Sequence, residues 1–342
     1  MGQLLSHPIE DKEIIYQSHE TVSYCIGSMQ GYRTTMEDAY DVKVNEDETL
    51  AVFGVFDGHG GKSCAEYLKV HLVDIIFKQL NIIGKQGTTK LSDYIRITKN
   101  AFFKVDSQLS SNKEFNNCGS TGIISALINN QYLVVANTGD SRCILSLGGQ
   151  PKTLSFDHKP VIMNERVRIE NSNGYIKNNR INEILALSRA FGDFKFKLPY
   201  IDSPRNEYIN KNKQYFKNDL IHLPPELFQV TVEPEVILFD IENASKNPKT
   251  KPEFMVIACD GIWDCYKNKD LINTIRHKLS VGWKLNKIIE FILHDCLMMA
   301  SNYTGIGFDN MTIIIIALHK GTDMDQWYES MKHKVLTEKG LA

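Results

Sequence analysis

Four aspartates of this 342-residue chain stand at the ends of apolar runs. Asp57 and Asp260 each follow such a run and precede a glycine, Asp140 follows a run and a glycine, and Asp309 comes shortly before the run 311–318. If these ends meet, several carboxylates share one small volume, where they repel one another unless cations neutralise them. Oxygen ligands favour hard cations such as Mg²⁺ or Mn²⁺ over zinc. A turn explains any single Asp-Gly pair, but the four together favour a metal site.

Residues near these aspartates extend the chemistry toward an anionic substrate. Glu37 and Asp38 form another acid pair, which alone would be an ordinary solvated surface pair. His59 lies two residues after Asp57, where an imidazole is well placed to act as a general acid. Arg33 precedes the acid pair, and its guanidinium fork suits phosphate. The group therefore indicates an anion bound beside metal ions.

Short runs of β-branched and aromatic residues predict the strands that carry these aspartates. The expected strands span 21–29, 50–56, 122–128, 132–137, 143–147, 236–239, 254–259 and 311–318. Helical periodicity predicts helices at 63–80, 92–109, 161–171, 269–279 and 284–300. Strands thus come in groups with helices between the groups, which favours a layered α+β fold over a parallel βαβ sheet.

Two stretches fall outside these elements. Residues 195–228 carry several prolines among polar residues, and we expect an irregular connection there, of a length that is usually functional or mobile. Residues 323–339 are predicted to form an exposed helix, with Trp327 and Met331 as a short apolar stripe.

The composition narrows the function classes. A net charge of −2 without a basic cluster argues against nucleic-acid binding. The seven cysteines include no Cys-x-x-Cys pair, which argues against a zinc knuckle and favours reduced thiols in the cytosol or nucleus. We expect neither a secretory signal nor a transmembrane helix.

The first residues also fit an N-myristoylation pattern with Gly2 as the acceptor, although short patterns often match by chance. No polybasic segment follows, so one acyl chain would give only weak, reversible membrane association. Peripheral membrane localisation therefore depends on whether Gly2 is acylated.

An ordered set of segments then resembles a known family. The segments are 32–39, 56–61, 119–121, 137–142, 157–160, 187–193, 258–264 and 309–312. In this order they look like the motifs of type 2C metal-dependent serine/threonine protein phosphatases, closest to fungal, yeast-type members. The resemblance implies a four-layer αββα fold, in which two antiparallel sheets are flanked by helix pairs. It places a catalytic domain at 23–318 with a flap at 195–228, after an N-terminal segment 1–22 and before a helical tail 319–342.

The resemblance also implies a binuclear metal centre. By the family pattern, the Asp57 carboxylate bridges two Mg²⁺ or Mn²⁺ ions. Asp260 and Asp309 complete the shell of one ion, and Glu37 and the Gly58 carbonyl bind the other. These ions together activate the water that attacks phosphorus.

Further roles carry over by position. Asp140 and Asp264 match acids that hold a weaker third metal ion, and Asp38 matches a residue that orients metal-bound waters. Arg33 is expected to contact the substrate phosphate, and Arg189 is expected to be a further substrate-binding residue. His59 is the candidate general acid for the leaving serine or threonine oxygen.

The implied activity is hydrolysis of phosphoserine and phosphothreonine in proteins, which would counteract kinase signalling. The expected partners are phosphoproteins, kinases of a signalling cascade among them, and the chain is expected to be a cytoplasmic or nuclear monomer. Two alternatives stay open: a catalytically weak scaffold that binds phosphoproteins, and another two-metal hydrolase such as a nuclease, against which the near-neutral charge argues. Residues 177–184 and 195–228 depart from the family pattern, which leaves the choice of substrate open.

Overall fold

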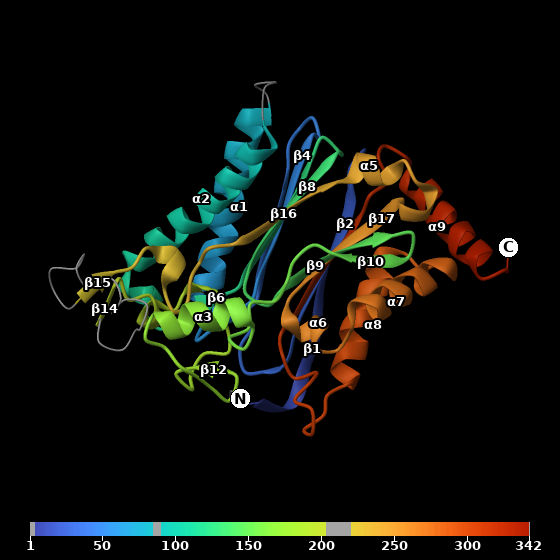
Figure 1. The fold of residues 1–342 in the computed structure, drawn as a ribbon. Coiled ribbons are helices and arrows are strands. Elements are labelled where there is room, and N and C mark those ends of the chain that lie inside the picture. Colours follow the sequence, from blue (N-terminus) through green and yellow to red (C-terminus); the bar gives the residue numbers. More distant parts are fainter. Residues whose placement is uncertain (1–3, 85–89, 203–219, 342) are drawn as a thin grey trace.

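The computed structural model describes residues 4–84, 90–202 and 220–341, and within these ranges two antiparallel sheets pack face to face (Figure 1). The first sheet has the strand order β1-β2-β18-β17-β9-β10. Its strands are β1 (Leu4–Ser18), β2 (Ser23–Arg33), β18 (Met311–Ala317), β17 (Pro252–Ala258), β9 (Arg142–Leu147) and β10 (Gln150–Thr153).

The second sheet has the strand order β16-β8-β7-β4-β3. Its strands are β16 (Glu235–Asp240), β8 (Tyr132–Thr138), β7 (Gly122–Ile128), β4 (Leu50–Phe56) and β3 (Ala39–Val44). Since β4 and β8 both run antiparallel to β7, their C-terminal ends lie at the same edge of the sheet.

Helices cover the outer face of each sheet. The pair α1 (Ser63–Gly84) and α2 (Leu91–Ser110) packs on the second sheet. The pair α7 (Asn268–Ser280) and α8 (Leu285–Met298) packs on the first sheet, and α9 (Met324–Glu338) lies against α7 (Figure 1). Within the described ranges, none of the helices combines the length and apolar character that crossing a bilayer requires.

Alternation along the central strands explains why they read as continuous apolar runs. In β17, Val256 faces α7 and α8, whereas Met255 and Ile257 enter the core between the sheets. In β4, Val52 faces α1 and α2, whereas Phe53 enters the core between the sheets. A strand covered on both faces has no polar side, so the residues that point to either face are apolar.

The predicted α+β fold of two antiparallel sheets flanked by helix pairs is confirmed. Each of the eight expected strands is present, with ends displaced by no more than a few residues. The sequence prediction missed β1, because an edge strand tolerates a run of charged residues such as 10–13, and its Ile9 and Tyr16 remain exposed. The predicted N-terminal segment 1–22 thus contributes a strand to the first sheet.

The predicted C-terminal helix is present, but the prediction that it is exposed was wrong. In α9, Met324, Trp327, Tyr328, Met331 and Val335 are buried, and four of them join the core beneath α7 and α8. The predicted helical tail 319–342 therefore includes a helix that is part of the packed fold.

A small lobe lies beside one end of the sandwich. It contains α3 (Met163–Asn171), the hairpin β11 (Ile176–Lys177) and β12 (Arg180–Ile181), and the ladder β14 (Tyr200–Asp202) with β15 (Leu220–His222). The last two strands fall inside the stretch 195–228, whose described ends thus pair with each other where no elements were expected. Residues 203–219 of that stretch lie outside the described residues.

Candidate metal and phosphate site

The strand ends do bring aspartates together. Asp57 follows β4, Asp140 follows β8, and Asp260 begins the short helix α6 (Asp260–Trp263) after β17. Carboxylate oxygens of these three residues all lie within 4.8 Å of one another. Two strands of one sheet and one strand of the other thus converge on one point between the sheets.

Burial and mutual repulsion act on these carboxylates. The pKa of Asp57 is raised well above its usual range, first by burial and then by the charges of Asp260, Asp38 and Asp309. The pKa of Asp260 is raised in the same way, by burial and then by Asp140 and its other acidic neighbours. Such an arrangement is unfavourable unless cations neutralise it, and its donors are all oxygens, so the residues fit Mg²⁺ or Mn²⁺.

A cysteine borders the cluster without joining the donor set. The Cys259 sulfur lies within 4.8 Å of oxygens from Asp38 and Asp57. Burial raises the pKa of the Cys259 thiol well above its usual range. A thiol that stays protonated is a poor ligand for a hard cation.

Asp309 lines the same cavity, but it pairs with an arginine. Arg33 Nη2 donates to Asp309 Oδ2 at 2.5 Å, and both side chains are about one-third exposed, at 37% and 36%. Burial lowers the pKa of Arg33, but Asp309, Asp260 and Asp57 together outweigh burial and raise it. Arg33 is therefore a charged group at the edge of the acid cluster.

The predicted acid pair splits between two environments. Glu37 accepts hydrogen bonds from Thr35 (2.8 Å) and from the Gly61 N–H (3.2 Å) at the cavity wall. Asp38 is buried, accepts from the Thr312 hydroxyl at 2.7 Å, and has its pKa raised to about 7, mainly by burial.

Gly58 is packed closely beneath this pair. A Cβ at Gly58 would collide with the Glu37 carbonyl, so only glycine allows the two backbones to approach. This close approach places the Glu37 backbone beside the residue that follows Asp57.

The turn that carries Asp140 is held on both sides. Gly139 donates its N–H to His158 Nδ1 at 3.1 Å, and its carbonyl accepts from the His158 N–H (3.0 Å) and from Asn137 Nδ2 (3.1 Å). Asp140 itself is buried and accepts from Lys159 Nζ. The segment 157–160 thus holds the turn that carries Asp140 in place.

His59 forms a second polar pair at the cavity. It lies in β5 (Gly58–His59), which pairs with β6 (Gly119–Ser120), and β6 pairs with β13 (Phe191–Gly192). This small sheet brings Asp193 Oδ2 to 2.7 Å from His59 Nε2. Burial lowers the pKa of His59, but the charge and hydrogen bond of Asp193 outweigh it and raise the pKa.

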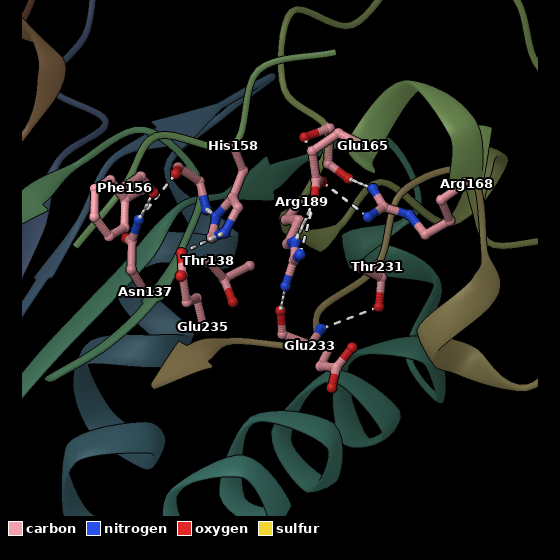
Figure 2. A network of polar contacts seen from close by, with 12 residues as sticks. Asn137, Thr138, Phe156, His158, Glu165, Arg168, Arg189, Thr231, Glu233 and Glu235 are labelled. Atoms are coloured by element: carbon pink, nitrogen blue, oxygen red, sulfur yellow. Dashed lines mark hydrogen bonds and ion pairs between the residues drawn. The ribbon is translucent and has the colours of Figure 1, made fainter. Parts of the chain in front are cut away.

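Arg189 does not line the cavity, and its expected contact with substrate stays a prediction. Its guanidinium donates to the Glu165 carboxylate, at 2.7 Å from Nη2, and to the Glu233 carbonyl at 2.9 Å (Figure 2). Arg168 joins Glu165 from the other side at 2.8 Å. Arg189 is thus part of an internal ion network that holds α3 against the residues before β16.

Two other predicted site residues lie at the margins. Asp264 is exposed and lies one helical turn after Asp260. Burial and the charge of Asp140 raise the pKa of Asp264 and together outweigh Lys159, which lowers it. Gly2 lies outside the described residues.

Sequence reasoning missed several partners of these residues. Asp193 is the last residue of the family-like segment 187–193, and Lys159 lies in the family-like segment 157–160. Both segments were recognised from the sequence, but neither residue was assigned a role. Thr312, which binds Asp38, had no chemical signal beyond its place beside Asp309. Their function depends on contacts between distant segments.

The site opens into a cavity of about 660 Å³. Its wall includes Asp57, Asp260 and Asp309 on the sandwich side, and Arg180 and Lys195 from the lobe. The volume is typical of a ligand cleft and exceeds what a single phosphate group needs.

Comparison with known proteins identifies the relatives of this architecture. Residues 22–305 match the family described as "Protein phosphatase 2C". Protein phosphatase 2C homolog 4 of Saccharomyces cerevisiae is 36% identical, covering 100% of both chains. Protein phosphatase 2C homolog 2 of Schizosaccharomyces pombe is 33% identical over 99% of this chain and 85% of its own.

Solved structures agree on the fold. The crystal structure of a phosphatase from Toxoplasma gondii superposes with a TM-score of 0.68 at 21% identity, covering 91% of this chain and 96% of that one. At this identity the likeness concerns the fold alone.

Proposed function

The chain belongs to the protein phosphatase 2C family, and from that premise we propose how its residues divide the work. The reaction is metal-dependent hydrolysis of phosphoserine and phosphothreonine in proteins. The observation that carries the assignment of roles is the meeting of Asp57, Asp140 and Asp260 oxygens within 4.8 Å.

We propose that two Mg²⁺ or Mn²⁺ ions bind this cluster. Asp57 would be the shared ligand, Asp260 and Asp309 would hold one ion, and Glu37 and the Gly58 carbonyl would hold the other. Cations bound there supply activation of water and neutralisation of phosphate charge. Asp140, a member of the cluster, and Asp264, at its margin, would hold a weaker third ion, and Asp38 would orient bound water from its buried position.

Arg33 is the proposed anchor of the substrate phosphate. Its present partner, Asp309, is also a proposed metal ligand, so the two roles compete for one carboxylate. A cation at Asp309 would take over that charge and leave the Arg33 fork for phosphate oxygens. Arg33→Ala should therefore raise KM for a phosphopeptide more than it lowers kcat, and an unchanged KM would remove Arg33 from this role.

His59 is the proposed general acid. Its pair with Asp193 favours the protonated imidazole, which can donate to the leaving serine or threonine oxygen. His59→Gln should lower kcat roughly 10²-fold or more for an alkyl phosphate substrate.

The deciding experiment is phosphate release from a phosphothreonine peptide, with and without Mn²⁺ or Mg²⁺ and with EDTA. We expect release that depends on metal and is lost in Asp260→Asn. Equal release by Asp260→Asn and the unaltered chain would overturn the proposed ligand set. The scaffold alternative is not favoured, because Glu37, Asp57, Asp260 and Asp309 are all present; absence of release with every metal would revive it.

We also propose that the substrates are phosphoproteins of kinase cascades and that the chain acts as a monomer in the cytoplasm or nucleus. Acylation of Gly2 would add weak, reversible membrane association. Mass spectrometry of the N-terminal peptide from cells tests the acylation directly.

A further inference from the structure

Some basic residues that line the cavity are already committed to carboxylates. Arg33 pairs with Asp309 at 2.5 Å, and His59 pairs with Asp193 at 2.7 Å. Both pairs belong to the phosphate and metal chemistry described above. They leave little charge free for other parts of a substrate.

Two further basic residues of the cavity wall have no such commitment. Arg180 is exposed and donates from Nη1 to the Ile184 carbonyl at 2.6 Å, while Lys195 is exposed and makes no ion pair with any other residue in the described ranges. The carboxylate closest to Arg180 in sequence, Glu183, is bound by Lys177 at 2.8 Å. Arg180 and Lys195 therefore present positive charge to the cavity.

The lobe holds Arg180 in place. Ile181, the next residue, is fully buried in a cluster with Leu187 and Phe196, and its N–H donates to the Leu185 carbonyl at 2.8 Å. Phe196 follows Lys195 directly and belongs to the same cluster. The backbone at both cations is thus anchored by one small core, and their exposed side chains extend from it toward the cavity.

We propose that Arg180 and Lys195 form a subsite for a second negative charge on the substrate, near the phosphorylated residue that is hydrolysed. The ligand is an anionic group, either an Asp or Glu carboxylate or a second phosphoryl group. Exposed Ile184, at 66%, lines the same wall and offers an apolar contact to the peptide between the two charges. The proposal rests on the proposed function, because it assumes that a phosphopeptide occupies the cavity.

The physical basis is charge complementarity at short range. An unpaired cation at a partly enclosed wall attracts an anion more strongly than a fully solvated one does. The effect is moderate at an exposed site, and salt weakens it. It should therefore appear as a substrate preference and not as a strict requirement.

The test uses three phosphothreonine peptides of equal length. One has neutral flanking residues, one has aspartates within three residues on both sides, and one has a single non-hydrolysable phosphonate side chain there. We expect kcat/KM for the two anionic peptides to exceed that for the neutral peptide by roughly three- to tenfold at low salt. Comparing these two peptides separates carboxylate from phosphoryl recognition, and 0.5 M NaCl should shrink the preference.

The variants assign the preference to residues. Arg180→Glu with Lys195→Glu should abolish or reverse it, whereas Lys195→Arg, which keeps the charge, should preserve it. Lys152→Glu makes the same charge change on β10, away from the cavity, and should also preserve it. Melting temperatures of all variants show whether they fold.

Two outcomes overturn the subsite: no preference in the unaltered chain, or a preference that survives the double charge reversal. Metal-dependent hydrolysis of a small aryl phosphate by the unaltered chain tests the proposed function separately, since that substrate has no flanking residues. A chain that hydrolyses the aryl phosphate but shows no peptide preference retains its catalytic assignment and loses only the subsite.

Discussion

At the scale of single residues, the site is governed by charges that the protein only partly balances. Lys159 contacts Asp140 and Arg33 contacts Asp309, but Asp57 and Asp260 keep raised pKa values because burial and acidic neighbours dominate. The remaining negative charge fits the binding of metal cations, in keeping with a metal-dependent family. Residues that appear secondary, such as Asp193, then decide the protonation of their neighbours.

Asp193→Asn should move the pH dependence of kcat. The pKa of His59 is raised by Asp193, so the protonated acid persists to higher pH in the unaltered chain. Without the carboxylate charge, His59 loses its proton at lower pH, and the alkaline limb of the kcat profile should shift to lower pH. The profile is measured on a phosphothreonine peptide with saturating metal, and an unmoved alkaline limb would exclude His59 as the acid.

At the scale of elements, buried ion networks hold the lobe and the sandwich together. Glu165 of α3 is 3% exposed and accepts from Arg189, Arg168 and Ser188. Burial alone would raise the pKa of Glu165, but these partners lower it from 4.5 to about 2. The network therefore stabilises the fold while Glu165 is ionised.

Glu165→Gln should reduce the free energy of unfolding at pH 7 by about 3 kcal/mol. A carboxylate with a lowered folded pKa contributes fully above its unfolded pKa of 4.5 and loses the contribution as the pH falls toward 2. The gap between the variant and the unaltered chain should thus be constant from pH 7 to 5 and narrow below pH 4.5. Urea unfolding measures it, with Glu170→Gln, an exposed pair partner on the same helix, as the control.

Trp327→Ala tests the packing of α9. Trp327 is 6% exposed and meets the Tyr328 ring edge-to-face, so its removal leaves a large cavity. We expect a loss of about 3–5 kcal/mol in unfolding free energy, with kcat per folded molecule unchanged. Ser330→Ala, on the exposed face of α9, is the matched control, and equal melting temperatures for the two variants would show that α9 contributes little.

At the scale of the whole molecule, the packing of the two sheets brings strand ends from both of them to one point. The core between the sheets fixes the distance between Asp57 and Asp260. Their repulsion lowers the free energy of unfolding, and the packing of the rest of the fold offsets this loss. Folding and metal binding are therefore linked, because cations bind the folded state and not the separated strands.

Asp57→Asn should melt at a higher temperature than the unaltered chain in EDTA, because one charge leaves the repelling cluster. Added Mn²⁺ should raise the melting temperature of the unaltered chain by several degrees and that of Asp57→Asn by less. Turnover should fall by about a thousandfold or more. Equal Mn²⁺-induced shifts in both proteins would contradict the shared-ligand role of Asp57.

The sequence by itself determined the strands and helices of the core, and it marked the aspartates at the strand ends, because apolar periodicity and turn residues are local signals. Strand β1 was invisible since an exposed edge needs no apolar pattern. Only the tertiary structure decided which side chains meet. Arg33 and Asp309 are 276 residues apart in sequence, and His59 and Asp193 are 134 apart. Arg189 matched a motif yet binds Glu165, since the partner of a charged side chain is set by the packing of distant segments.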